Sequence, residues 1–378
     1  MSNEGFQLVV PGGTWSRAMC RLSTASSELA VAKLSIDHQR HPTGLLVDDL
    51  RVVSSDPNGS EWPPLASWCV IAMPGGDPPN DPRVWIERLR PSYAQLFTVL
   101  LLGFGDDRSG WRGWTVEQGE VRPLAGFQLV GPLMLRVGDI ASEGEIFPED
   151  PQRWSRVEGA VGSGFAQLRR SSVTLIGCSR SGTLAAVMLA SLGVRKLSLV
   201  DGDKIELHNL DGMFLAAEQD LGRNKAEVIA ERLIAFRPNM AISISPHALG
   251  SHDADFEFGD TDLVVTCVDR DAPRLRAAKL CNHRLIPHLD IATGVSLDSD
   301  GSRQMAADVR LLLPGEGCIE CVGGLRSLVR AAHELEAVPG AWLPWPVESW
   351  ESGKRLGSLI TLNSTAVGSA TVLSFGNS

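Results

Sequence analysis

The sequence feature that most constrains the fold is a short apolar run that ends in glycine and leads directly into a helix. The run is SVTLIG, at residues 172–177, and a helical spacing of apolar residues follows at 181–192. A second apolar run, KLSLVD, ends in an acid at Asp201. Strands that are apolar throughout and alternate with helices are typical of a parallel sheet buried on both faces. The second half of the chain is therefore predicted to be an α/β domain.

The alternation continues toward the C-terminus. Helices are predicted at 224–236 and 272–284, and strands at 241–245, 262–267 and 286–290. Strands and helices in strict turn predict a Rossmann-like, doubly wound and mainly parallel sheet, because each crossover helix returns the chain to the same end of the sheet. We expect the C-terminal domain to span residues 154–378.

The first part of the chain has a different character. It is rich in Trp, Pro and Gly, and its apolar runs at 44–47, 68–72 and 96–102 are short and isolated. These runs predict the strands of a smaller α+β domain over residues 1–139. Residues 140–153 combine charge, Pro and Gly, which is typical of a linker.

Composition narrows the classes of partner and compartment. The net charge is −10 and the pI about 5.3, which argues against nucleic acid or an anionic membrane as the main partner. The N-terminal residues lack a signal-peptide pattern, and no apolar run is long enough to span a bilayer. The 7 scattered cysteines are typical of reduced thiols, so a cytoplasmic protein is expected.

The loop after the first predicted strand carries the first chemical signal. Gly177 permits a tight turn and Gly182 lets the helix pack closely, so N–H groups at the helix start can face a nucleotide. Ser179 stands where a middle glycine would open the backbone to a pyrophosphate. Asp201 is placed to bond ribose hydroxyls. These four residues fit NAD and ATP equally well, and a purely structural turn with a solvated carboxylate is the alternative.

Three further motifs follow in order. They are Asp201-Gly-Asp203 with Asn209, then Gly222-Arg-Asn-Lys225 at a helix start, and then Asp269 at a strand end in the run DRDAPR. Together with the glycine loop, these motifs resemble the ubiquitin-activating-like adenylyltransferase family, also called the ThiF/MoeB/HesA family. The resemblance covers about residues 154–375. It implies a Rossmann-like domain that adenylates a carboxylate with ATP and Mg²⁺.

The resemblance assigns a role to each polar residue. Lys225 is expected to neutralise the polyphosphate, and Asn209 to bond phosphate or ribose. Asp269 is expected to hold Mg²⁺, with Asp203 as a weaker candidate for the same ion. Adenylation expels pyrophosphate, so a cation and a hard-oxygen metal ligand are needed where negative charge gathers. Taken singly, these residues could also be a surface lysine, a turn asparagine and a helix-capping aspartate.

Two arginine positions bear on the same reaction. The family places an arginine where this chain has Gly212, so a cation that helps to expel pyrophosphate is missing from its usual position. Either Arg180 or Arg223 is expected to replace it, unless activity is weakened. Upstream, Trp154-Ser-Arg156 resembles a lead-in whose arginine reaches the ATP of a partner subunit. This implies a homodimer with Arg156 as a catalytic finger, and a solvated linker arginine is the alternative.

A CxxC pair, Cys318 and Cys321, follows a Pro-Gly turn. In the family such a pair is often half of a four-cysteine zinc site. No cysteine follows Cys321, so a Zn²⁺ site here is incomplete. The pair is then a structural relic, a partial zinc site, or a thiol that takes the activated carboxyl as a thioester. We favour the structural interpretation.

The N-terminal domain resembles a Mov34/MPN (JAB-type) isopeptidase domain around Glu28, the run GLLVDD and the run from Val70 to Asp77. That domain carries two metal-binding histidines where this chain has Ile71-Ala-Met73-Pro. The resemblance therefore implies an inactive domain that serves as a binding module. An unrelated α+β domain is the alternative.

The leading hypothesis is an enzyme that adenylates the C-terminal carboxylate of a small ubiquitin-like or sulfur-carrier protein, with thioester transfer as a later step. The alternatives within the family are modification of a ribosomal peptide or of a tRNA-borne carboxylate, and a catalytically dead scaffold. A nicotinamide-dependent dehydrogenase is the alternative from another class of enzyme. The acidic balance disfavours tRNA, and Lys225 with Asp269 disfavours the dehydrogenase.

Overall fold

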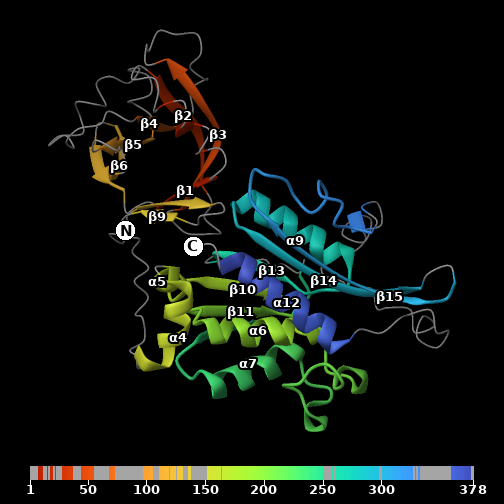
Figure 1. Ribbon diagram of the computed structural model, residues 1–378. Coiled ribbons are helices and arrows are strands. Elements are labelled where there is room, and N and C mark those ends of the chain that lie inside the picture. Colours follow the sequence, from red (N-terminus) through yellow and green to blue (C-terminus); the bar gives the residue numbers. More distant parts are fainter. Residues whose placement is uncertain are drawn as a thin grey trace. The chain divides into compact units, whose positions relative to one another are not determined.

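In the computed structural model the chain divides into two compact units, residues 1–143 and 144–378 (Figure 1). The structure describes residues 151–162, 164–249, 261–297, 300–326 and 359–375, with a few single positions between them. Before residue 151 it describes little more than the strands. None of the helices in these described parts is long and apolar enough to cross a bilayer.

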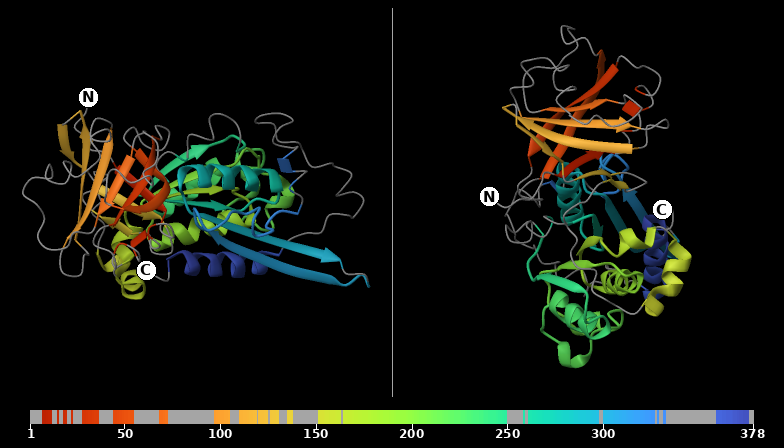
Figure 2. Two further views of the ribbon diagram at one scale, coloured as in Figure 1. Left: turned by 90° about the horizontal axis from the view of Figure 1, so that it is seen from above. Right: turned by 90° about the vertical axis from the view of Figure 1, so that its left-hand side faces the viewer.

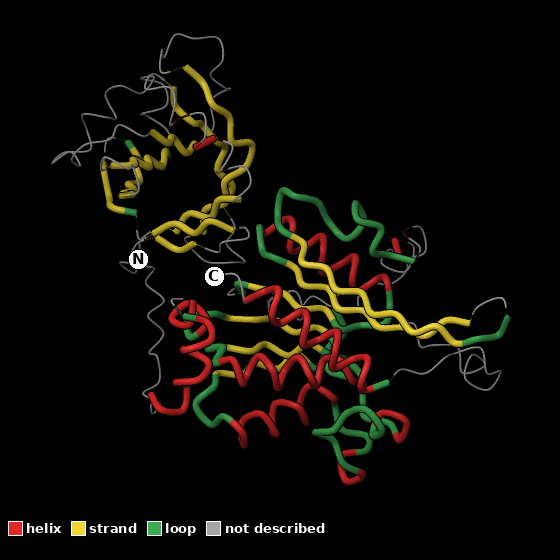
Figure 3. The backbone as a smooth tube through the Cα atoms, viewed as in Figure 1, coloured by secondary structure: helices red, strands yellow, loops and turns green. Residues whose placement is uncertain are grey.

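The N-terminal unit is built on β-strands (Figure 3), and these strands form a mixed sheet. Its described residues form nine strands in the order β7-β6-β5-β4-β2-β3-β1-β8-β9. β1 is parallel to β3 and β8, and β4 is parallel to β5. The strands are β1 (Gln7–Pro11), β2 (Glu28–Ile36), β3 (Gly44–Ser54), β4 (Trp68–Ala72), β5 (Thr98–Phe104), β6 (Gly110–Glu117), β7 (Glu120–Pro123), β8 (Gly126–Val130) and β9 (Leu135–Val137).

An aromatic group anchors the core of this unit. The ring of Trp15 lies 4.9 Å from that of Trp111 and 5.5 Å from that of Phe127, measured between centroids. The strands predicted at 44–47 and 68–72 fall in β3 and β4, and the strand predicted at 96–102 overlaps β5, which begins at Thr98. Met73, Pro74 and Asp77, on which the isopeptidase resemblance depends, lie outside the described residues, so that resemblance stays a prediction.

The C-terminal unit contains the predicted parallel sheet. Among its described residues six strands lie in the order β12-β11-β10-β13-β14-β15. Neighbours from β12 to β14 are parallel, and β15 is antiparallel to β14. The strands are β10 (Ser172–Ile176), β11 (Lys196–Val200), β12 (Ala241–Ser245), β13 (Leu263–Thr266), β14 (His288–Leu297) and β15 (Arg303–Leu312). The Rossmann-like α/β prediction is confirmed.

Helices cover both faces of this sheet (Figure 2). α6 (Arg180–Leu192), α7 (Lys225–Phe236) and α12 (Ile360–Phe375) share one apolar core, and α9 (Asp271–Arg284) packs into another. Side chains alternate along a strand, so Leu175 of β10 enters the first core and the adjacent Ile176 enters the second. α4 (Pro151–Val161) and α5 (Gly164–Leu168) precede β10.

In the C-terminal unit, two segments depart by more than one residue from the sequence-based expectation. The strand predicted at 286–290 begins at His288 and continues to Leu297, paired throughout with the unpredicted β15. The outer half of β15 is exposed, so backbone pairing continues there after the apolar pattern has ended. Residues 151–153, expected in the linker, are already part of α4.

Candidate active site

Two glycines shape the loop between β10 and α6. Gly177 has a φ of +90°, and a Cβ atom there would lie 2.7 Å from the carbonyl oxygen of Cys267. A Cβ atom on Gly182 would lie 1.8 Å from the carbonyl oxygen of Gly177. Either side chain would force backbone atoms apart. The glycines therefore let α6 begin directly against the carboxyl end of β10.

The residues between these glycines form the start of α6. Ser179 is the N-cap residue, and its carbonyl oxygen accepts the N–H of Thr183 at 2.8 Å. The hydroxyl of Ser181 accepts a hydrogen bond from Nδ2 of Asn363, in α12, at 2.5 Å. The first N–H groups of a helix have no intrahelical acceptor, so this end of α6 favours an anion. The contact of Ser179 with a pyrophosphate stays a prediction.

The carboxylate of Asp201, directly after β11, joins two loops. Its Oδ2 accepts the N–H of Cys178 at 2.6 Å, and its Oδ1 accepts the N–H of Asp203 at 2.8 Å. Burial raises the pKa of Asp201, and the charge of Lys225 opposes that rise. The contact of Asp201 with ribose hydroxyls stays a prediction. A ribose hydroxyl would share oxygens that already accept backbone hydrogen bonds.

Lys225 opens α7 and is buried. Its Nζ lies 2.9 Å from Oδ2 of Asp203. Burial acts to lower the pKa of Lys225, but the carboxylates of Asp201, Asp203 and Asp269 together raise it above its ordinary value. The ammonium group is thus held in its charged form within an acidic cluster.

Asp269 follows β13 and is exposed, and its charge acts on Lys225. β11, β10 and β13 are neighbours in the sheet, so the segments that follow their carboxyl ends meet at one edge. The structure thereby brings together Asp201, Asp203, Lys225 and Asp269, as the sequence motifs suggested. Their roles toward a ligand stay predictions.

The oxygen donors of this cluster fit a magnesium–nucleotide complex. The described residues contain no group of three or more His, Cys, Asp or Glu side chains that could hold a metal by themselves. Mg²⁺ characteristically keeps several waters and binds one or two carboxylates together with substrate phosphates. The exposed Asp269 suits this role, and Asp203 forms an ion pair with Lys225.

Asn209 shapes the turn that follows β11. It ends the 3₁₀ helix η1 (Leu207–Asn209), is buried, and accepts the N–H of Glu206 on Oδ1 at 2.9 Å. Its carbonyl oxygen accepts the N–H groups of Gly212 at 3.1 Å and Met213 at 2.9 Å. The contact of Asn209 with phosphate or ribose stays a prediction.

The side chain of Arg180 crosses directly over Gly212. A Cβ atom at Gly212 would lie 2.2 Å from Nε and 2.3 Å from Cγ of Arg180. The guanidinium donates from Nη2 to the carbonyl oxygen of His208 at 3.2 Å and forms an ion pair with Asp211. Arg180 therefore occupies the space that a side chain at position 212 would need.

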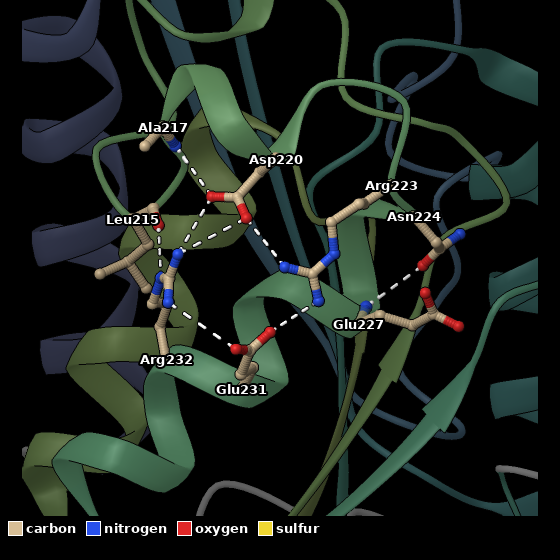
Figure 4. Close-up of polar contacts among 8 residues, drawn as sticks. All are labelled: Leu215, Ala217, Asp220, Arg223, Asn224, Glu227, Glu231 and Arg232. Carbon is tan, nitrogen blue, oxygen red and sulfur yellow. Dashed lines mark hydrogen bonds and ion pairs between the residues drawn. The ribbon is translucent and has the colours of Figure 1, made fainter.

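Arg223, the other predicted replacement, is bound in a separate network (Figure 4). Its Nη1 lies 2.8 Å from Oδ1 of Asp220, and its Nη2 lies 2.6 Å from Oε2 of Glu231. Asp220 ends the 3₁₀ helix η2 (Glu218–Asp220) and also accepts from Arg232 at 3.1 Å and from the N–H of Ala217 at 3.0 Å.

Asp220 was missed by the sequence motifs. Burial acts to raise its pKa, but the hydrogen bonds it accepts lower that pKa below its ordinary value. An Asp three residues before an Arg is an ordinary surface pattern. Only the approach of Arg232, from the third turn of α7, reveals a buried carboxylate.

The lead-in helix α4 is fixed by Trp154. Its buried ring lies 4.5 Å from the guanidinium carbon of Arg237 and 4.9 Å from that of Arg169. These distances are typical of cation–π contacts. Arg156, two residues later, is exposed. An anchored helix thus presents Arg156 to solvent, and its role across a dimer stays a prediction.

Arg274, the last residue of the DRDAPR run, serves a different set of contacts. Its Nε donates to Oδ1 of Asp290 at 2.9 Å, and its Nη2 pairs with the other oxygen. Thr266 donates to the same Oδ1 at 2.7 Å and lies 2.8 Å from Nε2 of His288. The cluster joins α9 to β13 and β14, and it was also not foreseen.

The Sγ atoms of Cys318 and Cys321 lie 3.5 Å apart in the turns after β15. Hydrogen bonding to the backbone and thiol of Cys318 lowers the pKa of the exposed Cys321 thiol. Two sulfurs alone do not build a closed zinc site, which needs four ligands. An exposed thiol of lowered pKa is the more reactive kind, so Cys321 is the stronger nucleophile candidate of the two.

Residues 154–338, which include the glycine loop, the acidic cluster and the CxxC pair, match the ThiF family. This segment is a ThiF family domain. Within the chain, the ThiF domain therefore supplies every predicted nucleotide-site residue.

Curated relatives agree with this assignment. The chain is 28% identical over 196 residues to ubiquitin-like modifier-activating enzyme 5 of Culex quinquefasciatus, a match covering 48% of this chain and 47% of that protein. It is 27% identical over 171 residues to the enzyme of the same name from Oryza sativa subsp. japonica, covering 42% and 39%. The matches therefore span about half the length of these relatives or less.

Solved structures are more distant. A crystal structure of E. coli MccB with ATP aligns with a TM-score of 0.44 and 21% identity, covering 62% of this chain and 66% of that chain. TcdA (CsdL) aligns with a TM-score of 0.36 and 22% identity, covering 39% and 60%.

Proposed function

We propose that the ThiF domain binds ATP with Mg²⁺ and adenylates a carboxylate. The observation that carries this proposal is the buried, charged Lys225 within the acidic cluster, at the sheet edge where the glycine loop opens α6. Such a cation suits a polyphosphate, and the neighbouring Asp269 suits its metal ion. Binding of a dinucleotide such as NAD requires neither this lysine nor a metal-binding aspartate.

The reaction follows from these placements. A carboxylate oxygen attacks the α-phosphorus, a new C–O–P bond forms, and the bond from the α-phosphorus to the bridging oxygen of pyrophosphate breaks. Lys225 and the N-terminus of α6 stabilise negative charge on the phosphates. Asp269 would hold Mg²⁺, which when bound neutralises phosphate charge. Arg156 of a second subunit is our candidate for further charge stabilisation in a homodimer.

The substrate we propose is the C-terminal carboxylate of a small ubiquitin-like or sulfur-carrier protein. The name of the curated relatives, ubiquitin-like modifier-activating enzyme 5, supports this class. The N-terminal domain is proposed to bind that protein. A ribosomal peptide is the second candidate substrate. A tRNA-borne carboxylate is disfavoured, because the chain is acidic. We place the reaction in the cytoplasm.

Calorimetric titration tests which nucleotide the protein binds. The protein should bind ATP with Mg²⁺ well above NAD, and Asp269→Asn should weaken the Mg²⁺-dependent part about tenfold, as expected for a lost charged ligand. Asp300→Asn, in the turn between β14 and β15, is the matched control and should change nothing. NAD binding as tight as ATP binding would exclude the proposal.

Turnover is tested by ATP–pyrophosphate exchange. Exchange should depend on an added small protein with a free C-terminal Gly-Gly. A folded protein that binds ATP but exchanges no pyrophosphate with any protein or peptide carboxylate would favour a scaffold instead.

A further inference from the structure

The contact between Arg180 and Gly212 joins two segments that are separate in sequence. Arg180 is the first residue of α6, and Gly212 lies in the turn after β11. The aliphatic part of Arg180 lies so close to Gly212 that even a methyl group would overlap it. The side chain is only 20% exposed. Its course is therefore set by packing against the glycine.

The guanidinium thereby links the segments that follow β10 and β11, because it extends from the start of α6 to His208 and Asp211 in the turn after β11. These two strands are neighbours in the sheet. Anionic groups of nucleotides characteristically bind at the carboxyl ends of such strands, beside a helix N-terminus. The planar guanidinium can bind two phosphate oxygens at once.

The carboxylate that pairs with Arg180 belongs to an exposed residue, Asp211. Asp211 is 67% exposed, so its carboxylate can exchange the guanidinium for water at little cost. The pair is thus easily replaced by a phosphate. Arg223 differs, because its partner Asp220 is only 1% exposed and would be left buried without that cation.

We infer that Arg180 binds the β- and γ-phosphates of ATP, and that position 212 must be glycine because the arginine crosses it. In the free protein Asp211 holds the guanidinium, and the phosphates replace that carboxylate. The inference rests on the proposed function, since it names the group that would hold the leaving pyrophosphate.

The first test compares ligands that differ only in phosphates. Arg180→Ala should weaken ATP binding about tenfold or more, as for a lost charge-assisted contact, and leave AMP binding unchanged. Inorganic pyrophosphate should lose affinity in parallel with ATP. Arg195→Ala is the matched control, because this arginine precedes β11 at the opposite end of the sheet and should change no affinity.

The second test uses the shared space. Gly212→Ala adds one methyl group and no charge, yet it should displace Arg180 and weaken ATP binding without affecting AMP. The double variant Arg180→Ala/Gly212→Arg returns an arginine to the same space from the other segment. It should bind ATP more tightly than Arg180→Ala alone.

The outcomes separate the two claims. If the unmodified protein binds no ATP, the proposed function fails and this inference with it. If the unmodified protein binds ATP, but Arg180→Ala weakens ATP and AMP binding equally or weakens neither, then only the role assigned to Arg180 is wrong. A folded double variant that binds no better than Arg180→Ala would show that the two positions do not share one phosphate-binding space. Circular dichroism and thermal unfolding establish that each variant is folded.

Discussion

The ammonium nitrogen of Lys225 lies 2.9 Å from Oδ2 of Asp203. The backbone closes the same junction, because the N–H of Lys225 donates to the carbonyl of Asp203 at 3.0 Å and the N–H of Ile205 to that of Arg223 at 2.8 Å. The loop after β11 is thereby fastened to the start of α7. Any ligand that draws Lys225 toward it competes with Asp203.

Replacing Lys225 with Met keeps the volume and removes the charge. ATP binding should fall at least tenfold. The free energy of unfolding at neutral pH should fall by about 1–3 kcal/mol, because buried Asp201 loses its cation. Burial already raises the pKa of Asp201, and the substitution raises it further. The stability deficit should therefore shrink as the pH falls and Asp201 takes up a proton.

Thermal unfolding at several pH values measures this deficit. Lys196→Met, at the first position of β11, is the matched lysine control. A deficit that stays constant or grows in acid would contradict the assigned coupling between Lys225 and Asp201.

Arg156 offers a test of assembly. If it acts across a two-fold axis, Arg156→Ala should abolish partner-dependent exchange and leave the dimer intact. Mixing it with Lys225→Met should restore part of the activity, because each hybrid dimer regains one complete site. Light scattering reports the oligomeric state. A monomer, or mixtures as inactive as their components, would remove Arg156 from catalysis.

Variants of the two cysteines in the CxxC pair distinguish adenylation from thioester formation. We expect Cys318→Ser and Cys321→Ser each to leave exchange within about twofold of the unmodified protein, since attack on the α-phosphorus uses no thiol. A non-reducing gel after incubation with ATP and an exchange-competent small protein provides the second readout. An adduct that is lost on reduction and lost in Cys321→Ser would make Cys321 the nucleophile.

His288 should make the fold sensitive to mild acid. Burial lowers its pKa from 6.5 to about 4, with Arg274 adding to this shift and Asp290 opposing it. Thr266 donates its hydroxyl hydrogen to Asp290, so Nε2 of His288 carries the proton given to Thr266. A second proton would enter at Nδ1, which is buried and has no hydrogen-bond partner in the described part of the chain.

Because the pKa of His288 is lower in the folded protein than in the unfolded chain, its contribution to stability is fully present above pH 6.5. This contribution is lost as the pH falls toward 4. The loss should reach about 3 kcal/mol at most. His288→Gln keeps a donor for Thr266 and cannot take up the proton, so its stability should fall less over this range. Urea unfolding from pH 7 to pH 4 measures the difference, and identical slopes for both proteins would contradict the assignment.

The sequence by itself determined the α/β order, the glycine loop, the acidic positions after the strands and the lysine at the start of α7. These follow from local properties: apolar periodicity selects strands and helices, and Gly177 and Gly182 stand where side chains would strike the backbone. The family resemblance, carried by the order of the motifs, implied that Asp201, Lys225 and Asp269 serve one nucleotide site, and the edge at which the parallel strands end brings them together.

Only the tertiary structure decided which arginine fills the space at Gly212 and what Arg274 and Asp220 contact. Each of these relations joins residues from different elements, and side-chain reach and burial, which no local pattern records, determine them. The same holds for the length of β14, which is set by backbone pairing with β15 after the apolar pattern has ended. The sequence positions of the charged residues could be read from the motifs, whereas the contacts that these residues make depend on how the elements pack.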